Sequence, residues 1–433
     1  MAKWSRRQFG AMTLAGIAAS PWSGGTEAMA QSAKTRTAET GTTTAANVST
    51  AYVAVGPELT QYAVEGTTIS PVPGSMVSVP APIQYVWQHP GKPVAYVASS
   101  DRFAAKPADL HHVSAFAMAP GSGKLSLIGA PRLLTARPIN ISTDRDGRFL
   151  LVAYNDPASL AVHPIAADGS IGEAIKQDGK LDAGIYAHQV RMLPSNRTVL
   201  LVTRGNDPAG GKPEDPGALK VFSFNQGKLA EKQSVAPGSG YGFGPRHADF
   251  HPTKPWFYVT MERENQLQTF TIGAGDRISP APAFVKTTLA EPGKVRPGQV
   301  AGAIHVSRDG RFVYVSNRAD GKTELDGRKV FVGGENSIAV FAIDPRTGEP
   351  TLIQAVDTRS YHVRTFAIDP SGKTLLAASV APMDVASGGT VSTVPAKLTA
   401  FAIGADGKLS FTAERAVDTA KGPMFWCGFT PLT

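Results

Sequence analysis

Cysteine is almost absent from the chain: Cys427 is the only one among 433 residues, so no internal disulfide bond can form. Charged residues make up only 18%, and no uninterrupted apolar run approaches the roughly 18 residues that a membrane-spanning helix needs. Lysine and arginine are not clustered with aromatic residues, as they are in many nucleic-acid-binding surfaces. These absences exclude a disulfide scaffold and a membrane-spanning helix, and they argue against a nucleic-acid partner.

Glycine and proline are abundant instead, with 44 and 33 residues, and apolar residues account for 42% of the chain. This composition is typical of many short strands and tight turns around a substantial core. The formal net charge of +8 favours anionic small molecules or cell-envelope polymers as ligands.

The N-terminus has the three parts of an export signal in the required order. The twin-arginine motif SRRQF occupies residues 5–9, an apolar run spans residues 10–19, and AMA at residues 28–30 is a small-x-small cleavage site. Cleavage after Ala30 removes three basic residues and one acidic residue, which leaves a formal charge of +6. We therefore expect a periplasmic or secreted protein.

The remaining chain divides into two parts. Residues 31–49 are rich in alanine, threonine and serine and have almost no large apolar side chain, so we expect a flexible linker. The domain boundaries predicted from the sequence are thus residues 1–30 for the signal peptide, 31–49 for the linker and 50–433 for the folded domain. We expect this domain to be a monomer.

From residue 84 onward, two kinds of hairpin alternate along the chain. The first has a turn such as DRDGRF at residues 144–149 or SRDGRF at 307–312, and the second has a turn such as GADGKL at 404–409. Glycine, aspartate and asparagine provide the positive-φ positions of tight hairpins, and the flanking residues alternate as half-buried strands do. Six four-stranded units follow one another at intervals of about fifty residues, which is the period of propeller blades.

Both chain ends lie outside these six units. Residues 51–72 contain three strands that lack a first strand, and residues 423–429 contain one strand that lacks the other three. Together they complete a seventh blade, which removes the exposed strand edges of an open array. We therefore predict an all-β fold, a seven-bladed β-propeller of four-stranded antiparallel blades, with the last blade closed by the N-terminal strands plus the C-terminal strand. A β-sandwich or a solenoid is the alternative.

The antiparallel order of strands predicts where a functional site lies. The start of a blade's first strand and the end of its second strand meet at the same mouth of the central channel. A cationic, imidazole-rich set with one prominent carboxylate is expected there. At starts of first strands we place His188, Arg246, His247, His305 and Arg364, and at ends of second strands Asp101, Asn155, Arg204, Glu262 and Arg318.

Three segments resemble the seven-bladed β-propeller lactonase family. They are AHQV at residues 187–190, GPRHADFHP at 244–252 followed by Glu262, and IHVSRDGRFVYVSNR at 304–318. The similarity covers essentially the whole mature chain. Members of this family include 6-phosphogluconolactonases and fungal carboxymuconate cyclases, so the resemblance implies that a lactone ring is opened or closed. It also implies that His188, Glu262, Arg246 and Arg318 share one mouth, as in the cyclases.

The chain departs from the family pattern at three places. Ala303 stands where an acidic residue commonly precedes IHVS, and Tyr186 stands where the first of two paired histidines would fall. Residues 203–205 read TRG where many relatives have DLG.

Lactone hydrolysis needs a base for water and a positive group for the carbonyl oxygen. We assign catalytic roles to three residues: His188 as the general base, Arg246 as the oxyanion or carboxylate ligand, and Glu262 as the group that orients the histidine or the arginine. The expected substrate-binding residues are Arg318, Arg204, Arg364 and His305. This scheme requires neither a metal nor another cofactor.

The sequence favours an exported lactonase that opens a sugar-derived or other anionic lactone, with this small molecule as its partner. Two alternatives stay open: a non-catalytic propeller that binds a ligand or protein in the cell envelope, and a carboxymuconate cyclase-like isomerase. The structural alternative for Arg246 and Glu262 is a salt bridge between blades, which an arginine and a glutamate in successive strands commonly form. We expect structural roles for four histidines, and we expect His247 to point away from its neighbour Arg246; the four are His89, His163, His247 and His251.

Overall fold

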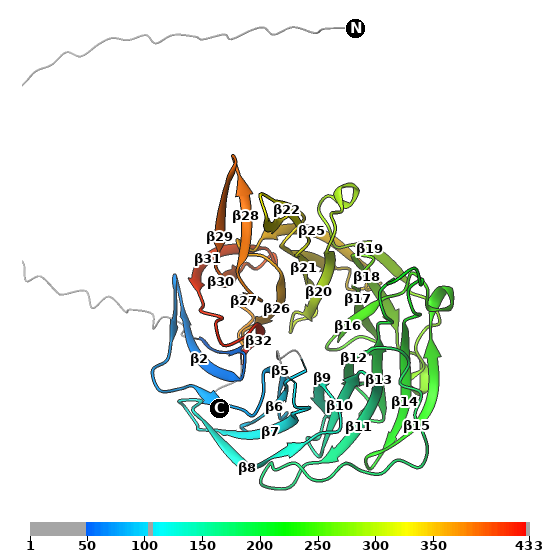
Figure 1. The fold of residues 1–433 in the computed structure, drawn as a ribbon. Helices are drawn as coiled ribbons and strands as arrows, with labels where there is room; N and C mark the ends of the chain where they lie inside the picture. The colour runs from blue at the N-terminus through cyan, green and yellow to red at the C-terminus, as the bar shows by residue number, and fades with distance from the viewer. Residues whose placement is uncertain (1–48, 103–106, 430–433) are drawn as a thin grey trace, which may run out of the picture. The chain divides into compact units, whose positions relative to one another are not determined.

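The computed structural model describes residues 49–102 and 107–429, which form a ring of seven antiparallel sheets around a central channel (Figure 1). The described residues belong to one compact unit, Ala46–Thr433. The predicted signal peptide and nearly all of the predicted linker lie outside the described residues; Ser49 already begins the first strand.

Blades 1 to 4 follow one another along the chain. In each, the first strand lines the channel and later strands lie progressively further out (Figure 1). Blade 1 comprises β5 (Ile83–Gln88), β6 (Val94–Ser100), β7 (His111–Met118) and β8 (Leu125–Leu133); blade 2 β9 (Pro138–Thr143), β10 (Phe149–Asn155) and β11 (Ala158–Pro164); blade 3 β12 (Ala187–Met192), β13 (Thr198–Thr203), β14 (Ala218–Asn225) and β15 (Lys228–Val235); and blade 4 β16 (Pro245–Phe250), β17 (Trp256–Met261), β18 (Gln266–Thr271) and β19 (Phe284–Thr287).

Blades 5 and 6 each carry an additional hairpin between their second and third strands. The hairpins project beyond the outline of the ring in Figure 1. Blade 5 comprises β20 (Gln299–Val306), β21 (Phe312–Ala319), β24 (Ser337–Ile343) and β25 (Pro350–Asp357), with the hairpin β22 (Lys322–Leu325) and β23 (Arg328–Phe331); blade 6 comprises β26 (Val363–Ile368), β27 (Thr374–Ser379), β30 (Lys397–Ile403) and β31 (Leu409–Ala416), with the hairpin β28 (Met383–Ser387) and β29 (Thr390–Val394).

Blade 7 joins the two ends of the described chain. It comprises β32 (Met424–Phe429), β1 (Ser49–Val55), β2 (Glu58–Glu65) and β3 (Thr68–Pro71), and the short β4 (Val77–Ser78) also pairs with β2. The register runs from Ala51 opposite Phe429 to Ala54 opposite Trp426. The predicted closure is confirmed, and the ring leaves no unpaired inner strand at this point. Three short 3-10 helices complete the elements of the described residues: η1 (Pro237–Gly240), η2 (Ala274–Asp276) and η3 (Pro292–Lys294).

Blade 2 departs from the predicted four strands, because its sheet has only β9, β10 and β11. The chain beyond β11 still runs beside it, since Ile165 bridges Ile171 and the Ile175 amide donates to the Val162 carbonyl at 2.8 Å. Pro164 lies at the end of β11 and has no N–H to donate, so a continuous ladder does not form. The fourth strand is therefore reduced to isolated contacts.

Neighbouring blades are joined by apolar packing and by repeated tyrosine contacts. Between blades 3 and 4, for example, Leu200 and Val202 pack in one buried cluster with Phe257 and Val259. Burying each such side chain contributes about 1.5–3 kcal/mol. Hydroxyl groups on second strands donate to turn carbonyls of the next blade: Tyr96 to Gly169 at 3.2 Å, Tyr258 to Gly348 at 3.0 Å and Tyr314 to Gly407 at 2.9 Å.

The glycine in the DGR turns has a definite steric role. Gly147 has φ +68°, and a Cβ there would lie 2.3 Å from the imidazole of His89 in blade 1. The same imidazole donates from Nε2 to the Gly147 carbonyl at 3.0 Å, because its Nδ1 accepts from the Gly91 amide. The turn motif thus serves blade-to-blade packing as well as hairpin formation.

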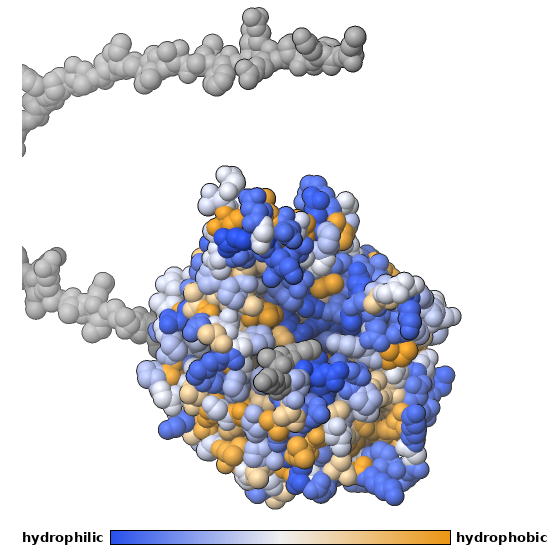
Figure 2. Space-filling model, in the orientation of Figure 1, coloured by the Kyte–Doolittle hydropathy of each residue, from blue (hydrophilic) through white to orange (hydrophobic). Residues whose placement is uncertain are grey.

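The exposed face in Figure 2 is mixed in polarity. Hydrophilic side chains gather over the projecting hairpins and over the side formed by β16 to β21, whereas apolar patches are more frequent over β5 to β8. Among residues 49–102 and 107–429, no helix is long and apolar enough to cross a membrane.

Candidate active site

The innermost strand of every blade contains a β-bulge at the equivalent position. In β16, for instance, Pro245 pairs with Met261 and His247 with Thr260, so Arg246 is an additional residue without a partner. A bulge re-aims the side chains beside it. The bulged residues, in blade order, are Gln84, Ile139, His188, Arg246, Gly302 with Ala303, Arg364 and Phe425.

This bulge corrects the expectation for His247. Strict alternation would turn His247 away from Arg246, but both residues line the channel, and Arg246 Nη1 lies 3.2 Å from His247 Nδ1. The rings of His247 and His188 meet edge to face with centroids 5.0 Å apart. His247 is therefore part of the candidate site rather than a structural histidine that points away from Arg246.

The central channel contains a cavity of about 380 Å³. The residues that the sequence places at starts of first strands all line it: His188, Arg246, His247, His305 and Arg364. Blade 5 contributes only Gly302 and Ala303 at the level of the bulges, so little side-chain volume lies between Arg246 and Arg364 there. The bulges thus place two arginines and a histidine on the channel wall, together with Gln84, Ile139 and Phe425, and they leave a gap at blade 5.

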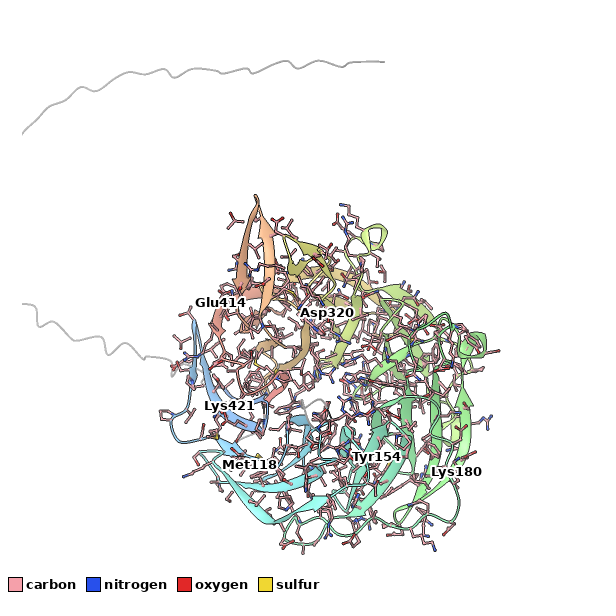
Figure 3. The ribbon with its side chains drawn as sticks, in the orientation of Figure 1. Met118, Tyr154, Lys180, Asp320, Glu414 and Lys421 are labelled. Carbon is pink, nitrogen blue, oxygen red and sulfur yellow. The ribbon has the colours of Figure 1, made fainter. Side chains whose placement is uncertain are left out.

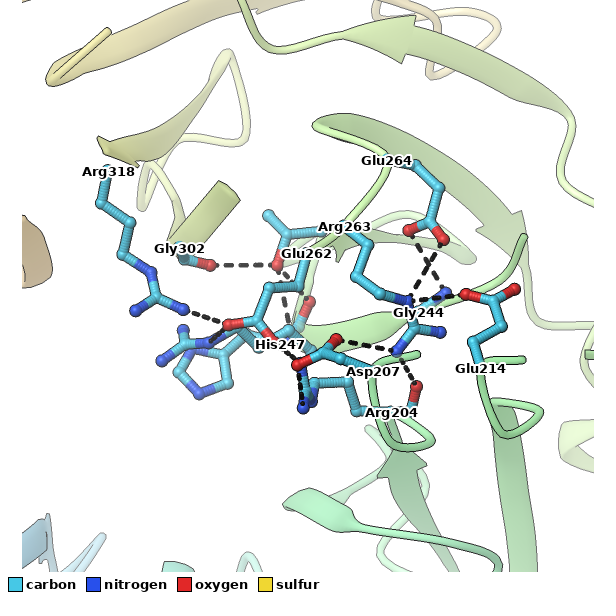
Figure 4. A network of polar contacts seen from close by, with 12 residues as sticks. Arg204, Asp207, Glu214, Gly244, His247, Glu262, Arg263, Glu264, Gly302 and Arg318 are labelled. Atoms are coloured by element: carbon cyan, nitrogen blue, oxygen red, sulfur yellow. Dashed lines mark hydrogen bonds and ion pairs between the residues drawn. The ribbon is translucent and has the colours of Figure 1, made fainter. Parts of the chain in front are cut away.

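Glu262 is the centre of a buried ion-pair network beside this channel (Figure 4). It follows β17 directly, and its Oε1 lies 3.0 Å from Arg246 Nε and also accepts from Arg318 Nη2. Its Oε2 accepts from Arg204 Nη1 at 2.8 Å. Blades 3, 4 and 5 therefore place Arg204, Arg246 and Arg318 on one carboxylate, and the predicted clustering of these residues is found in the structure.

The charges of this network determine its protonation. Burial opposes ionisation of Glu262, but Arg318, Arg246 and Arg204 outweigh it and lower the pKa of Glu262 to about 2. Burial lowers the pKa of Arg246 well below its usual value, and the nearby Arg318 acts in the same direction while Glu262 opposes it. At neutral pH the cluster is a carboxylate with three guanidinium groups, and the excess charge is positive.

Arg364 contributes a further cation on the channel wall. It forms no ion pair within the described ranges, and its guanidinium carbon lies 4.7 Å from the centroid of the Phe425 ring. Burial, followed by repulsion from Arg318 and Arg137, lowers the pKa of Arg364 to about 10. It is still charged at neutral pH, so an anion in the channel would gain its full attraction.

His188 lies in the channel as a neutral imidazole. Burial is the largest cause that lowers the pKa of His188 well below 6.5, and repulsion from Arg246 is the second. Its Nδ1 is buried and has no hydrogen-bond partner among the described residues. One side of the imidazole stacks on Tyr186 at a centroid distance of 6.3 Å. Ring contacts therefore hold His188 in place. Of the two roles predicted for Glu262, the structure shows the one toward the arginines and not the orientation of His188.

His305 does not join the mouth that the sequence assigned to it. It is the penultimate residue of β20 rather than a residue at its start, and its Nε2 lies 2.9 Å from the Phe366 carbonyl oxygen. It occupies the position equivalent to Asp249, whose carboxylate pairs with Arg191 at 3.0 Å further along the channel. His305 lines the channel, but it belongs to this deeper part and not to the network around Glu262.

The loop after β13 is fixed to the network by residues that the sequence analysis did not single out. Arg204 donates from both terminal nitrogens to Asp207, at 3.0 Å each. Arg263 lies 3.5 Å from Asp207 and 2.9 Å from Glu214 of the same loop (Figure 4). The repeated charges around residues 262–264 are the signal in the sequence that points to this attachment.

The residues present also define what the site lacks. In the part of the chain that the structure describes, no three histidine, cysteine, aspartate or glutamate side chains are close enough together to hold a metal ion. The chemistry available consists of guanidinium groups that attract and stabilise negative charge, together with neutral imidazoles next to them.

The family relationship follows from a direct match. Residues 41–386 match the model of the family "Lactonase, 7-bladed beta-propeller". The chain belongs to this lactonase family. The predicted family is thereby confirmed.

Individual relatives agree with this assignment. A 6-phosphogluconolactonase of Bacillus subtilis is 27% identical over 62% of this chain and 70% of its own length, and one of Pectobacterium carotovorum is 32% identical over 57% and 71%. Among solved structures, the periplasmic gluconolactonase of Pseudomonas aeruginosa superposes with a TM-score of 0.66 at 20% identity, covering 89% of this chain and 100% of that one. The structural likeness shows a shared fold.

Proposed function

We propose that this protein hydrolyses the ring ester of a sugar-derived or otherwise anionic lactone at the mouth of the channel formed by blades 3 to 6. The observation that carries the proposal is the position of Arg364, a cation without an ion-pair partner among the described residues, on the wall of the same cavity as the neutral His188. Lactonase relatives and the excess of positive charge support it.

The proposed binding mode uses the arginines according to their partners. Arg364 binds the anionic group of the substrate, because its charge is not compensated by a carboxylate in direct contact. Arg246 stabilises the negative charge that develops on the carbonyl oxygen, while Glu262 keeps its guanidinium in place. Arg204 and Arg318 fix Glu262 from both sides and add to the positive potential.

The proposed chemical step begins with a water molecule beside His188. The water oxygen attacks the lactone carbonyl carbon, His188 takes the water proton, and the ring C–O bond breaks when the tetrahedral intermediate collapses. The proton on His188 then passes to the leaving alkoxide, so the products are a carboxylic acid and an alcohol. A bound anion offsets the repulsion from the arginines and raises the pKa of His188, which improves it as a base when the substrate is present.

Acid release from a panel of aldonolactones near neutral pH tests this proposal. We expect His188→Ala to lower kcat by about 10² to 10⁴, the usual contribution of a general base. Lys180→Ala is the matched control, because Lys180 lies exposed at the outer rim (Figure 3) and should leave the rate unchanged. Equal rates for the parent and His188→Ala on every lactone would remove the hydrolase proposal.

Two alternative functions predict different outcomes of these assays. Clustered arginines also suit a dicarboxylate, so a cyclase-like isomerase would convert a muconate-type diacid without net hydrolysis. A binding propeller would bind aldonates or dicarboxylates and turn none of them over.

Export is part of the proposal. The motif at residues 5–9 supports transport of the folded protein out of the cytoplasm. The expected result is a periplasmic or secreted protein, and replacement of Arg6 and Arg7 by lysine should leave an uncleaved precursor in the cytoplasm. An unchanged distribution would contradict export by this route.

A further inference from the structure

Arg318 has a second partner besides Glu262. Its Nη1 lies 2.9 Å from His362 Nε2. A guanidinium can only donate, so Nε2 must be the acceptor and carries no proton. The other nitrogen, His362 Nδ1, lies 3.0 Å from Asp320 Oδ2, which makes Nδ1 the protonated nitrogen. Asp320, His362, Arg318 and Glu262 thus form a continuous chain of polar contacts.

The backbone holds His362 in this position. His362 directly precedes β26 and has φ +54°, in the left-handed region that non-glycine residues rarely adopt. The Asn336 side chain cross-links the two segments involved, because its Oδ1 accepts from the His362 amide at 2.8 Å and from the Ala319 amide at 3.0 Å. Strained conformations of this kind persist where the surroundings fix them, and they are frequent at functional sites.

The charges that face His362 come from two blades. Arg318 is the penultimate residue of β21 in blade 5, and Asp320 directly follows that strand. Arg364 belongs to β26 of blade 6. Burial lowers the pKa of His362, Arg318 and Arg364 act in the same direction, and Asp320 opposes them. Figure 3 shows Asp320 on the inner side of the projecting hairpins.

We propose that His362, oriented by Asp320, is a positioning residue that holds Arg318 against Glu262, and that protonation of His362 releases Arg318. A proton on Nε2 removes the acceptor and places a second positive charge 2.9 Å from the guanidinium. Glu262 then loses one of its three arginines. In acid, the substrate site would therefore weaken.

Histidine-selective ¹⁵N NMR tests the physical part of this proposal without relying on activity. The expected tautomer of His362 at pH 7.5 has its proton on Nδ1, and His362→Gln identifies the resonance. Removal of a neighbouring charge shifts the titration midpoint by about one pH unit, upward in Arg318→Gln and downward in Asp320→Asn. A proton on Nε2, or midpoints that neither substitution moves, would overturn the proposal.

The functional part rests on the proposed hydrolase and is tested by kcat and KM between pH 5 and 8. Glutamine offers an acceptor near Nε2 but does not titrate, so His362→Gln should keep the parent kcat/KM at pH 7.5 within about three-fold and flatten its fall in acid. His362→Leu offers no acceptor, and its KM should rise about ten-fold or more, as expected for a lost hydrogen bond to a charged group.

The controls separate the possible failures. His163 is a buried histidine of blade 2 whose Nδ1 lies 3.0 Å from the Gly172 carbonyl oxygen, so His163→Gln should leave the acid limb unchanged. An acid limb in His362→Gln that matches the parent, or a His362→Leu variant that matches the parent, would refute the positioning role. A parent that hydrolyses no lactone would refute the proposed function, and the NMR titration alone would then decide this inference.

Discussion

The two sides of Glu262 are built on the same plan but with different chemistry. On the blade 3 side, Arg204 is contacted by the ring of Tyr186, 4.6 Å from its guanidinium carbon, and by the carboxylate of Asp207. On the blade 5 side, Arg318 is contacted by the ring nitrogen of His362, whose far side meets Asp320. Tyr186 and His362 each stand two residues before a bulged residue, with φ +55° and +54°.

The difference lies in which side responds to pH. Asp207 bonds Arg204 directly, so that side keeps its contacts wherever the carboxylate is ionised. Arg318 depends on an unprotonated imidazole, so its side is lost in acid. The comparison indicates that Arg204 is a permanent anchor for Glu262, whereas Arg318 is a conditional one.

Glu262→Gln removes the anchor point of both sides and should have the largest effect. Three guanidinium groups lose their shared counter-charge inside the protein, and breaking a buried pair in this way costs about 3–5 kcal/mol. We expect a loss of that order in the free energy of unfolding, measured by denaturant titration. A variant as stable as the parent would show that the arginines do not need Glu262.

Acidification should lower the stability of the whole protein through its buried histidines. The pKa values of His188, His247 and His362 lie below 6.5 in the folded state, so the unfolded chain takes up protons first and stability falls as the pH drops below 6.5. Each unit of depression corresponds to about 1.4 kcal/mol. Glu262 adds no loss until the pH falls below its usual 4.5 towards about 2.

Denaturant titrations at pH 7.5, 6.5 and 5.5 measure this effect. His362→Gln should reduce the slope between pH 6.5 and 5.5, whereas Tyr186→Phe should not alter it. A parent that is equally stable at all three values would contradict the assigned protonation states.

Tyr186→Leu tests the blade 3 side, where Arg204 is the permanent anchor, and should have a smaller effect. It removes the ring that faces Arg204, and a cation–π contact of this kind is worth about 0.5–2 kcal/mol. We expect a loss of stability in this range at pH 7.5, where His188, which stacks on the same ring, is neutral. Tyr186→Phe keeps the ring and serves as the control.

Asp207→Asn should have the smallest effect. The Asp207 side chain is 55% exposed, and pairs at exposed sites contribute about 1 kcal/mol or less. The expected result is a minor change in stability together with greater protease sensitivity of the loop after β13. A loss comparable to that of Glu262→Gln would mean that this loop, rather than the carboxylate, organises the arginines.

Much of the fold was predictable from local signals. The turn residues and alternating strands fix the blade repeat, and the incomplete patterns at residues 51–72 and 423–429 predict the closure of the ring. The reduced fourth strand of blade 2 was not predicted, because the effect of Pro164 on a ladder depends on the partner segment.

The site was predictable as a set of residues but not in detail. A bulge moves side chains without changing the pattern of apolar residues, so alternation gave the wrong direction for His247. Counting back from each turn would have placed His305 correctly: Arg246, His188 and Arg364 lie five residues before the turn residue of their blades, whereas His305 lies two before Ser307. The contact between His362 and Arg318 joins residues 44 apart and has no local signal.

The most direct test of the proposed site is a crystal structure of the protein with the aldonate product of the best lactone substrate. We expect the product carboxylate, or another anionic group of the product, to contact Arg364. His188 should lie within hydrogen-bond distance of the hydrolysed group, and Glu262 should still be bound by Arg204, Arg246 and Arg318. A product bound at the opposite end of the channel, beside Arg191 and Asp249, would contradict it.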